Sequence, residues 1–231
     1  DAESDLVTKK RDNFMREFGE SVLKTRLFVG ADRIDYTKGI PERLKGFELM
    51  LMRHPELQSR VTFVQLAAPS RTHIEKYRDL NDQLDDLVDE INWRLCTEEW
   101  TPVRFLRAHH DYYDVLAAYR MADILLVTSL HDGMNLVAKE FIASRTDGDG
   151  ALILSEYTGA AREIPDALQI NPYDIDRLAD VMYRAFIISE EERRQRMARM
   201  RAQVEKHNVY DWGRKIFKEV EKLPLGETAV S

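Results

Sequence analysis

The chain has 231 residues, 44% of them hydrophobic, which is enough to bury the core of one large domain. It contains no run of the ~18 consecutive apolar residues that a membrane span needs, and its first residues lack the apolar segment of a secretory signal. The net charge of −7 argues against nucleic acid and anionic membranes as partners, so a bound phosphate would need a few local cations.

Short apolar runs alternate with longer helical patterns along the chain. The runs that we expect to be strands cover residues 25–31, 60–67, 102–107, 122–129, 151–156 and 167–171. The helical patterns between them cover residues 41–54, 71–91, 112–120, 134–145 and 157–164. Near-continuous apolar strands that alternate with helices predict a Rossmann-like, doubly wound α/β fold, with a parallel sheet between two layers of helices.

The two ends of the chain have helical patterns of their own. Residues 1–24 form an amphipathic pattern that leads into the first strand, and residues 174–206 form a helix-like, charge-rich segment. A further helical pattern covers residues 211–222. We therefore expect a leading helix or linker at 1–24, a domain at 25–206, and a C-terminal helix with a tail at 207–231.

A first candidate site follows the first predicted strand, in the segment GADRIDYTKG. In doubly wound sheets, ligands bind at the carboxyl ends of the strands, where the strand order reverses. Arg33 and Lys38 place two cations on this loop, and such a pair suits a pyrophosphate because arginine binds phosphate as a fork and lysine as a point charge. Gly39 permits a tight approach. The alternative is an arginine–aspartate pair beside a solvated lysine.

A second candidate site is the segment HDGMNLVAKE, at residues 131–140. Gly133 leaves room for a ligand, and the backbone amides at the start of the following helix are donors for a phosphate. Asp132 and Asn135 can hydrogen-bond to hydroxyl groups, and Glu140 can accept from a vicinal diol such as a ribose. The alternative is a tight turn and a capped helix, in which the early acid suits the helix dipole.

Two further strand ends carry polar residues with weaker signals. Arg71 follows the second predicted strand, and by spacing alone it is more readily a surface arginine. Ser70 or Thr72 could cap the next helix. His109 and His110 follow the third strand, where a histidine can contact a ligand but is more often a loop or packing residue.

The sequence does not favour a metal site. His109 and His110 have no third ligand nearby, and the segment DGDG at 147–150 consists of turn residues, so a solvated turn is the better interpretation. The single cysteine, Cys96, has no neighbours at zinc-ligand spacing and cannot form an internal disulfide. This cysteine usage favours the reducing cytoplasm.

Taken together, the motifs resemble one family. The segments DRIDYTKGIPERLKGFE, APSR, DGMNLVAKEF, LILSEYTGAAREI and INPYDIDRLADVMYRAF occur in this order. From about residue 25 to residue 222, the chain strongly resembles the C-terminal half of the trehalose-6-phosphate synthase family, which comprises retaining glycosyltransferases of the GT-B fold. The resemblance implies that residues 25–206 form a domain that binds a nucleotide sugar, the donor-binding half of that fold.

The resemblance also implies roles for matching residues. The positions that match donor-binding residues are Arg33, Lys38, His109, Asp132, Gly133, Met134, Asn135, Leu136, Val137 and Glu140. Within this set, Arg33 and Lys38 match the cations at the diphosphate, residues 132–135 match the segment at the glucose hydroxyls, and Glu140 matches the ribose-binding acid. Arg33, Lys38 and Asp132 are the catalytic candidates. Arg71 matches an arginine that reaches the phosphate of the acceptor.

The implied reaction transfers glucose, with retention, from UDP-glucose to glucose 6-phosphate and forms trehalose 6-phosphate and UDP. It requires no cofactor and no metal ion, because the cations stabilise the leaving diphosphate. The chain departs from the family in two ways: His131 stands where an arginine is usual, and the N-terminal domain that supplies most of the acceptor pocket is missing. We therefore expect no glucosyl transfer by this chain alone.

Two other functions remain open at this level. One is a related transferase with another phosphorylated acceptor, such as a glucosylglycerol-phosphate synthase, or a pseudo-glycosyltransferase. The other is a non-catalytic domain that senses a sugar nucleotide. The presence of Arg33, Lys38 and Glu140 argues against a degenerate site but does not distinguish turnover from binding.

Overall fold

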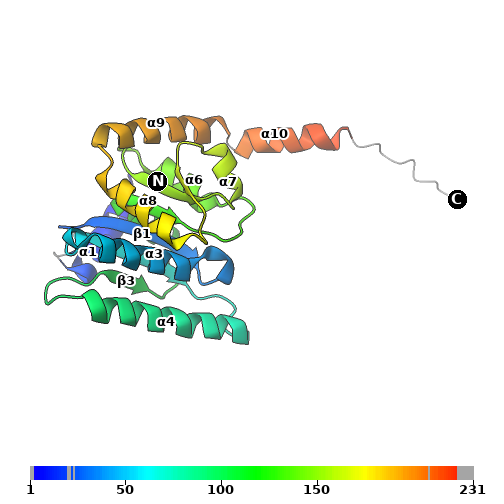
Figure 1. Cartoon of the computed structure of the whole chain (residues 1–231). Coiled ribbons are helices and arrows are strands. Elements are labelled where there is room, and N and C mark those ends of the chain that lie inside the picture. The colour runs from blue at the N-terminus through cyan, green and yellow to red at the C-terminus, as the bar shows by residue number, and fades with distance from the viewer. Residues whose placement is uncertain (1–2, 20–21, 23, 208, 223–231) are drawn as a thin grey trace.

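The computed structural model describes residues 3–19, 22, 24–207 and 209–222. Six strands of this part of the chain form one parallel sheet in the order β3-β2-β1-β4-β5-β6 (Figure 1). The strands are β1 (Arg26–Arg33), β2 (Val61–Ala68), β3 (Val103–Leu106), β4 (Ile124–Val127), β5 (Ala151–Ser155) and β6 (Leu168–Ile170). Because the order reverses between β1 and β4, the predicted doubly wound fold is confirmed.

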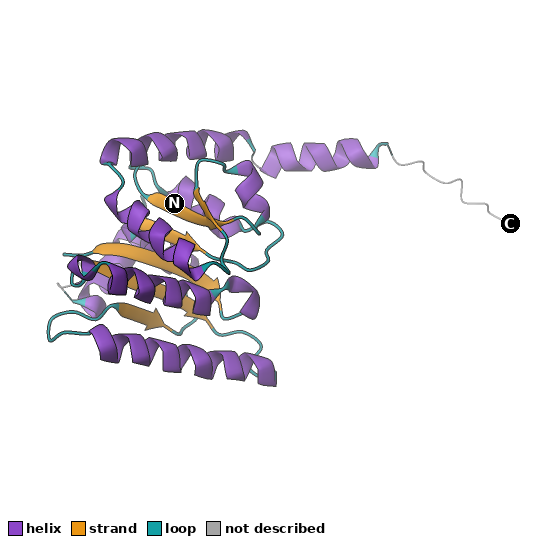
Figure 2. Cartoon of the chain, in the orientation of Figure 1, coloured by secondary structure: helices purple, strands orange, loops and turns teal. Residues whose placement is uncertain are grey.

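Helices lie on both faces of the sheet (Figure 2). The α-helices are α1 (Asp5–Phe18), α3 (Ile40–Arg53), α4 (Glu75–Leu95), α5 (Tyr112–Met121), α6 (Leu136–Ser144), α7 (Gly159–Glu163), α8 (Ile175–Ile187), α9 (Glu190–Lys206) and α10 (Val209–Val220). Two short 3-10 helices are η1 (Tyr36–Lys38) and η2 (Pro55–Leu57). Each predicted strand and each predicted internal helix has a counterpart among these elements.

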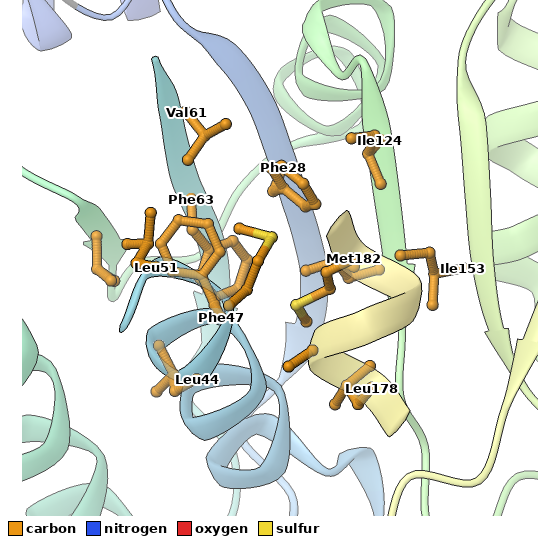
Figure 3. Packing of buried hydrophobic residues seen from close by; sticks show 14 of the residues in the cluster. Phe28, Leu44, Phe47, Leu51, Val61, Phe63, Ile124, Ile153, Leu178 and Met182 are labelled. Carbon is orange, nitrogen blue, oxygen red and sulfur yellow. The ribbon is translucent and has the colours of Figure 1, made fainter. Parts of the chain in front are cut away.

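The core consists of two apolar layers, one on each face of the sheet. Along β1, Phe28 joins the layer beneath α3, α4 and α8, while Leu27 and Val29 join the layer beneath α1, α5, α6 and α9. This division follows from the two-residue period of a strand, which points successive side chains to opposite faces. Figure 3 shows the first layer, in which Phe47 of α3 packs between Phe28 and Phe63. The sheet is thus buried on both faces, so a ligand can reach it only at the ends of the strands.

The helix after β2 begins later than the sequence predicts. It starts at Glu75 rather than near residue 71, and its N-cap is Ile74, without a side-chain cap from Ser70 or Thr72. The cause is Arg71, whose φ of 46° turns the chain, followed by a hydrogen bond of 2.9 Å from the Ile74 amide to the Arg71 carbonyl. The predicted cap was therefore wrong.

The charge-rich segment at 174–206 is two helices rather than one. Ile188 leaves the helical conformation, and Ser189 caps α9 by accepting a hydrogen bond of 3.2 Å from the Glu192 amide. Three glutamates, at 190–192, then occupy the first turn of α9, where acids suit the helix dipole. A serine followed by acids is a helix-start signal.

The ends of the chain differ in how they pack. In α1, Val7, Phe14 and Phe18 are buried, and Lys10 forms ion pairs with Asp111 at 2.8 Å and with Asp114 at 2.9 Å. Helix α10 projects beyond the body of the domain (Figure 1). Parts of the predicted leading helix (1–2, 20–21 and 23) and the predicted tail at 223–231 lie outside the described residues. In the part that is described, no helix is long and apolar enough to cross a membrane.

An ion pair joins α9 to the turn before β5. Arg193 donates to both carboxylate oxygens of Asp149, with an Nη2–Oδ2 distance of 2.8 Å. This bidentate contact outweighs the effect of burial and lowers the pKa of Asp149 from its usual 3.8 to about 2. Because the pKa is lower in the folded chain, the pair stabilises the fold above pH ~4 and loses this effect as the pH falls through about 2.

We expect Asp149→Asn to lower the free energy of unfolding by ~2 kcal/mol at pH 7, with a difference that shrinks as urea unfolding is repeated between pH 4 and pH 2. Asp176→Asn is the matched control, because Asp176 pairs with Arg53 at the surface, where its side chain is 75% exposed, and such pairs contribute ~0–1 kcal/mol. Equal losses in the two variants would contradict a special role of Asp149.

Candidate functional site

The candidate site lies where the loops after β1 and β4 meet, on either side of the point where the strand order reverses. The Leu130 amide donates to the Thr37 carbonyl at 2.8 Å, and Thr128 Oγ1 donates to the Gly39 carbonyl at 2.9 Å. Gly39 has a φ of 62°, and a Cβ there would lie 2.2 Å from the Thr128 carbonyl oxygen. Glycine therefore permits both this backbone conformation and the close approach of the two loops.

Lys38 and Asp132, both predicted site residues, form an ion pair between the two loops. Lys38 Nζ lies 2.6 Å from Asp132 Oδ2, and the two side chains are 18% and 16% exposed. The backbone amide and Nδ2 of Asn135 each donate to Asp132 at 3.1 Å. Burial acts to raise the pKa of Asp132, but the contacts with Lys38 and Asn135 outweigh it and hold this pKa below its usual value. The carboxylate is therefore charged at neutral pH and holds the lysine ammonium in place.

Asn135 starts α6 in the left-handed region of backbone conformation. Its φ is 56°, and its side-chain oxygen accepts a hydrogen bond of 3.0 Å from the Ala138 amide. Asparagine tolerates this conformation better than most residues and is a favoured N-cap. The amides of Leu136 and Val137 fall in the first turn, where the helix itself offers no acceptor. The predicted helix start is thus formed by the expected residues, and its binding of an anion stays a prediction.

The loop before α7 supports the turn at 132–134 from the other side. The Gly159 amide donates to the Asp132 carbonyl at 3.0 Å, and the Asp132 amide donates to the Tyr157 carbonyl at 3.3 Å. A Cβ at Gly159 would lie 2.0 Å from the Gly133 carbonyl oxygen, whereas a Cβ at Gly133 would meet no atom within 4 Å. Gly133 therefore leaves open space for a ligand, while Gly159, which has no evident chemistry in the sequence, allows the turn to sit where it does.

A cavity of about 290 Å³ opens beside Lys38. Its wall consists of Ala31, Asp32, Arg33, Lys38, Leu66, Ala68, His110, Val115, Tyr119, Val137 and Glu140. The hydroxyl group of buried Tyr119 donates to Glu140 Oε2 at 3.3 Å, and burial, followed by the charge of Glu140, raises the pKa of Tyr119 well above its usual value. Tyr119 therefore stays protonated and orients the carboxylate. The cavity has two cations and an oriented carboxylate in one wall.

Several predicted residues lie outside this wall. His109 is exposed, and its neighbour His110 lines the cavity instead. Gly133 lines an adjoining open pocket with Tyr157 and Thr158. Met134, in the turn before α6, and Leu136, the first residue of α6, are 56% and 53% exposed. Arg71 Nη1 donates a hydrogen bond of 3.1 Å to the Tyr77 hydroxyl group, and Arg71 is not among the residues that line the cavity.

A buried polar network beneath the loops is absent from the sequence prediction. The guanidinium of Arg43, which is fully buried, donates to Asp32 at 2.7 Å, to Gln65 at 2.6 Å and to Thr128 at 3.0 Å. Because Thr128 in turn donates to the Gly39 carbonyl, this network fixes the backbone that carries Lys38. The sequence contains one trace of this network, the glycine at position 30. A Cβ there would lie 2.2 Å from Arg43 Nη1, but this reason for the glycine can be recognised only in the structure.

The acidic turn DGDG is occupied by ion pairs. Asp147 pairs with Arg145 at 2.9 Å, and Asp149 pairs with Arg193. Among the described residues, no group of three or more histidines, cysteines, aspartates or glutamates is placed to hold a metal ion. The cations that line the cavity are Arg33 and Lys38.

Comparison with known proteins identifies the family to which the chain is similar. The model of glycosyltransferase family 20 matches residues 1–222. The chain is 37% identical, over 220 residues, to the UDP-forming alpha,alpha-trehalose-phosphate synthase of Pichia angusta, an alignment that covers 95% of this chain and 46% of the relative. It thus spans about half the length of the curated relatives that it matches.

Solved structures agree. The synthase of Burkholderia xenovorans in complex with glucose-6-phosphate superposes with a TM-score of 0.88 at 33% identity, over 93% of this chain and 48% of that one. A trehalose-6-phosphate synthase structure of E. coli, bound with UDP-2-fluoro glucose, gives a TM-score of 0.87 at 32% identity, over 94% and 49%. The predicted resemblance is confirmed over nearly the whole chain. The chain belongs to glycosyltransferase family 20.

Proposed function

We propose that this chain is the donor-binding half of a retaining glucosyltransferase that makes trehalose 6-phosphate and UDP from UDP-glucose and glucose 6-phosphate. The observation that carries the proposal is the cavity at the strand-order reversal, which has Arg33, Lys38 and Glu140 in one wall. Two cations suit a diphosphate, and an oriented carboxylate suits the two hydroxyl groups of a ribose. A solved relative is bound with UDP-2-fluoro glucose, whose diphosphate and ribose suit this arrangement, and another is in complex with glucose-6-phosphate.

The roles of the residues follow from their positions. Arg33, Lys38 and the first-turn amides of α6 hold the diphosphate and stabilise the charge that develops on it as the sugar departs. Glu140 accepts hydrogen bonds from the ribose. The turn at 132–135 faces the sugar hydroxyls, with Gly133 leaving room for them. His109 and Arg71 belong to the donor sugar and the acceptor phosphate respectively, as the family resemblance implies.

The second substrate and the location of the enzyme are parts of the same proposal. Glucose 6-phosphate binds with the half of the protein that its relatives possess beyond this chain, and we expect no glucosyl transfer without that half. The partners are small molecules rather than nucleic acid or membrane, and the compartment is the cytoplasm. Bound cations are not needed for the diphosphate, so EDTA should leave UDP affinity unchanged.

Calorimetry with the Glu140→Gln variant tests whether Glu140 binds the ribose. The variant keeps the size of the side chain and loses its charge, so UDP should bind more weakly by ~1–3 kcal/mol, whereas pyrophosphate, which has no ribose, should bind as before. Glu98→Gln is the matched control, because this exposed residue precedes the amino end of the edge strand β3, whereas the site lies at the carboxyl ends of the middle strands β1 and β4. Equal weakening of both ligands, or of neither, would contradict the role of Glu140; a wild-type chain that binds no UDP would refute the function itself.

A further inference from the structure

Asp35 is a buried carboxylate that touches the supports of the site rather than the cavity. It lies two residues after the end of β1 and is 6% exposed. Its Oδ1 accepts hydrogen bonds from the Thr37 amide at 3.0 Å and from the Thr37 hydroxyl group at 2.9 Å. These contacts cap η1, the turn that carries Lys38, and the Thr37 carbonyl in turn receives the Leu130 amide at 2.8 Å. One oxygen of Asp35 therefore fixes the lysine turn and, through it, the loop that leads to Asp132.

The second oxygen of Asp35 lies near Arg33 and is linked to Arg71 through the Tyr77 hydroxyl group. Arg33 Nη2 lies 3.8 Å from Oδ2, a loose contact that leaves the arginine 57% exposed. The Tyr77 hydroxyl group donates to the same oxygen at 3.3 Å and accepts from Arg71 Nη1 at 3.1 Å. Arg71 also lies over the Tyr77 ring, and its φ of 46° is uncommon for a residue with a side chain. Such a conformation persists where the surroundings hold it in place.

The charge on Asp35 is not required by the cap alone. Asparagine caps a helix start about as well as aspartate, so local structure would be served by a neutral side chain. Burial acts to raise the pKa of Asp35, but the bonds from Thr37 and Tyr77 outweigh it and keep this pKa below its usual value. A negative charge therefore stays behind the diphosphate cations at neutral pH. By Coulomb's law alone it weakens anion binding, so a benefit elsewhere must offset that cost.

We propose that Asp35, extended by Tyr77, is a positioning residue of the site, which aims Arg33 and Lys38 at the donor diphosphate and Arg71 at the acceptor phosphate without touching a ligand. The inference rests on the proposed function, because it presupposes that these three cations meet phosphates. It explains why one buried carboxylate accepts hydrogen bonds both from the β1 loop, through Thr37, and from α4, through Tyr77. It also accounts for the unusual backbone conformation of Arg71. That conformation places the side chain where the Tyr77 hydroxyl group, which is bonded to the β1 loop at Asp35, can hold it.

Asp35→Asn separates positioning from simple electrostatics, because the two predict opposite signs. If Asp35 positions the cations, UDP affinity of the 231-residue chain falls by about tenfold, the size of one lost charged hydrogen bond. If Asp35 acts only through its field, removing the negative charge tightens UDP binding, and added salt reduces the gain. The melting temperature without ligand should change little, because asparagine preserves the cap. Tighter or unchanged UDP binding by a folded Asp35→Asn chain would overturn the proposal.

Tyr77→Phe provides a second test that keeps every charge and the aromatic ring. It removes the hydroxyl group that donates to Asp35 Oδ2, so Asp35 holds Arg33 and the Lys38 turn less firmly, and we expect UDP affinity to fall by about threefold. Tyr183→Phe is the matched control, because Tyr183 stacks on His54 between α3 and α8, away from the site. Equal UDP affinities in the two variants would contradict the extension through Tyr77.

If the wild-type chain binds no UDP, the proposed function fails; if it binds UDP through Arg33 and Lys38 and only the Asp35 result is reversed, the positioning proposal alone fails.

Discussion

Replacing Arg43 with methionine should lower the free energy of unfolding by about 3–5 kcal/mol, the usual cost of removing one partner of a buried ion pair. Arg43 is fully buried, and Asp32, its partner at 2.7 Å, has a side chain only 3% exposed. Methionine fills much of the same volume but leaves the carboxylate of Asp32 without a counter-charge. Thr128 and Gln65 would each lose a donor as well. We therefore expect a large drop in the urea midpoint with a nearly unchanged slope.

Two comparisons make this result specific to the buried charge. Arg53→Met removes an arginine from exposed partners, Asp176 and Asp180, and should cost no more than ~1 kcal/mol. Adding Asp32→Asn to Arg43→Met should restore part of the lost stability, because the uncompensated charge is removed. If the double variant is less stable than the single variant, packing rather than charge explains the role of Arg43.

The fold was predictable because its determinants are local in the sequence. The strand runs are apolar at successive positions, as strands buried on both faces must be, and turn or charge-rich segments separate them. The errors have local causes that compete with these patterns. At Arg71 the left-handed backbone delays α4, and at Ser189 a cap followed by acids divides a long helical pattern into α8 and α9.

The candidate site was predictable only in part. Arg33, Lys38 and Glu140 stand at strand ends or one turn beyond them, so the topology alone brings them to one cavity. The supporting residues are different, because Arg43 and Tyr77 meet the site from helices whose packing no sequence spacing reveals. The histidine pair shows the limit of such reasoning. The position after a strand predicts that one histidine reaches the cavity. The path of the backbone after β3 decides which one, and it is His110 rather than His109 that lines the wall.

Lys38→Ala should produce the largest loss of UDP affinity among single substitutions at the site. The substitution removes a charge-assisted contact worth ~1.5–3 kcal/mol. It also leaves Asp132, which lies 2.6 Å from Lys38 Nζ, without its counter-charge beside the phosphates. Repulsion between that carboxylate and the ligand adds to the loss, so we expect a decrease of at least about 100-fold at pH 7.5 by calorimetry.

The two contributions separate in a double variant and in the pH dependence. Lys38→Ala with Asp132→Asn removes the repulsion and should bind UDP more tightly than Lys38→Ala alone.

In the single variant, burial still acts to raise the pKa of Asp132 while the contact with Lys38 that lowered it is gone. The pKa of Asp132 should therefore be higher in Lys38→Ala than in the wild type, although the bonds from Asn135 still lower it, and the affinity of the variant should approach that of the wild type as the pH is lowered from 7.5 toward this pKa. The double variant lacks this carboxyl group and should show no such gain. Identical pH profiles for the single and double variants would mean that Asp132 does not face the diphosphate, and that Lys38 acts through its own contact alone.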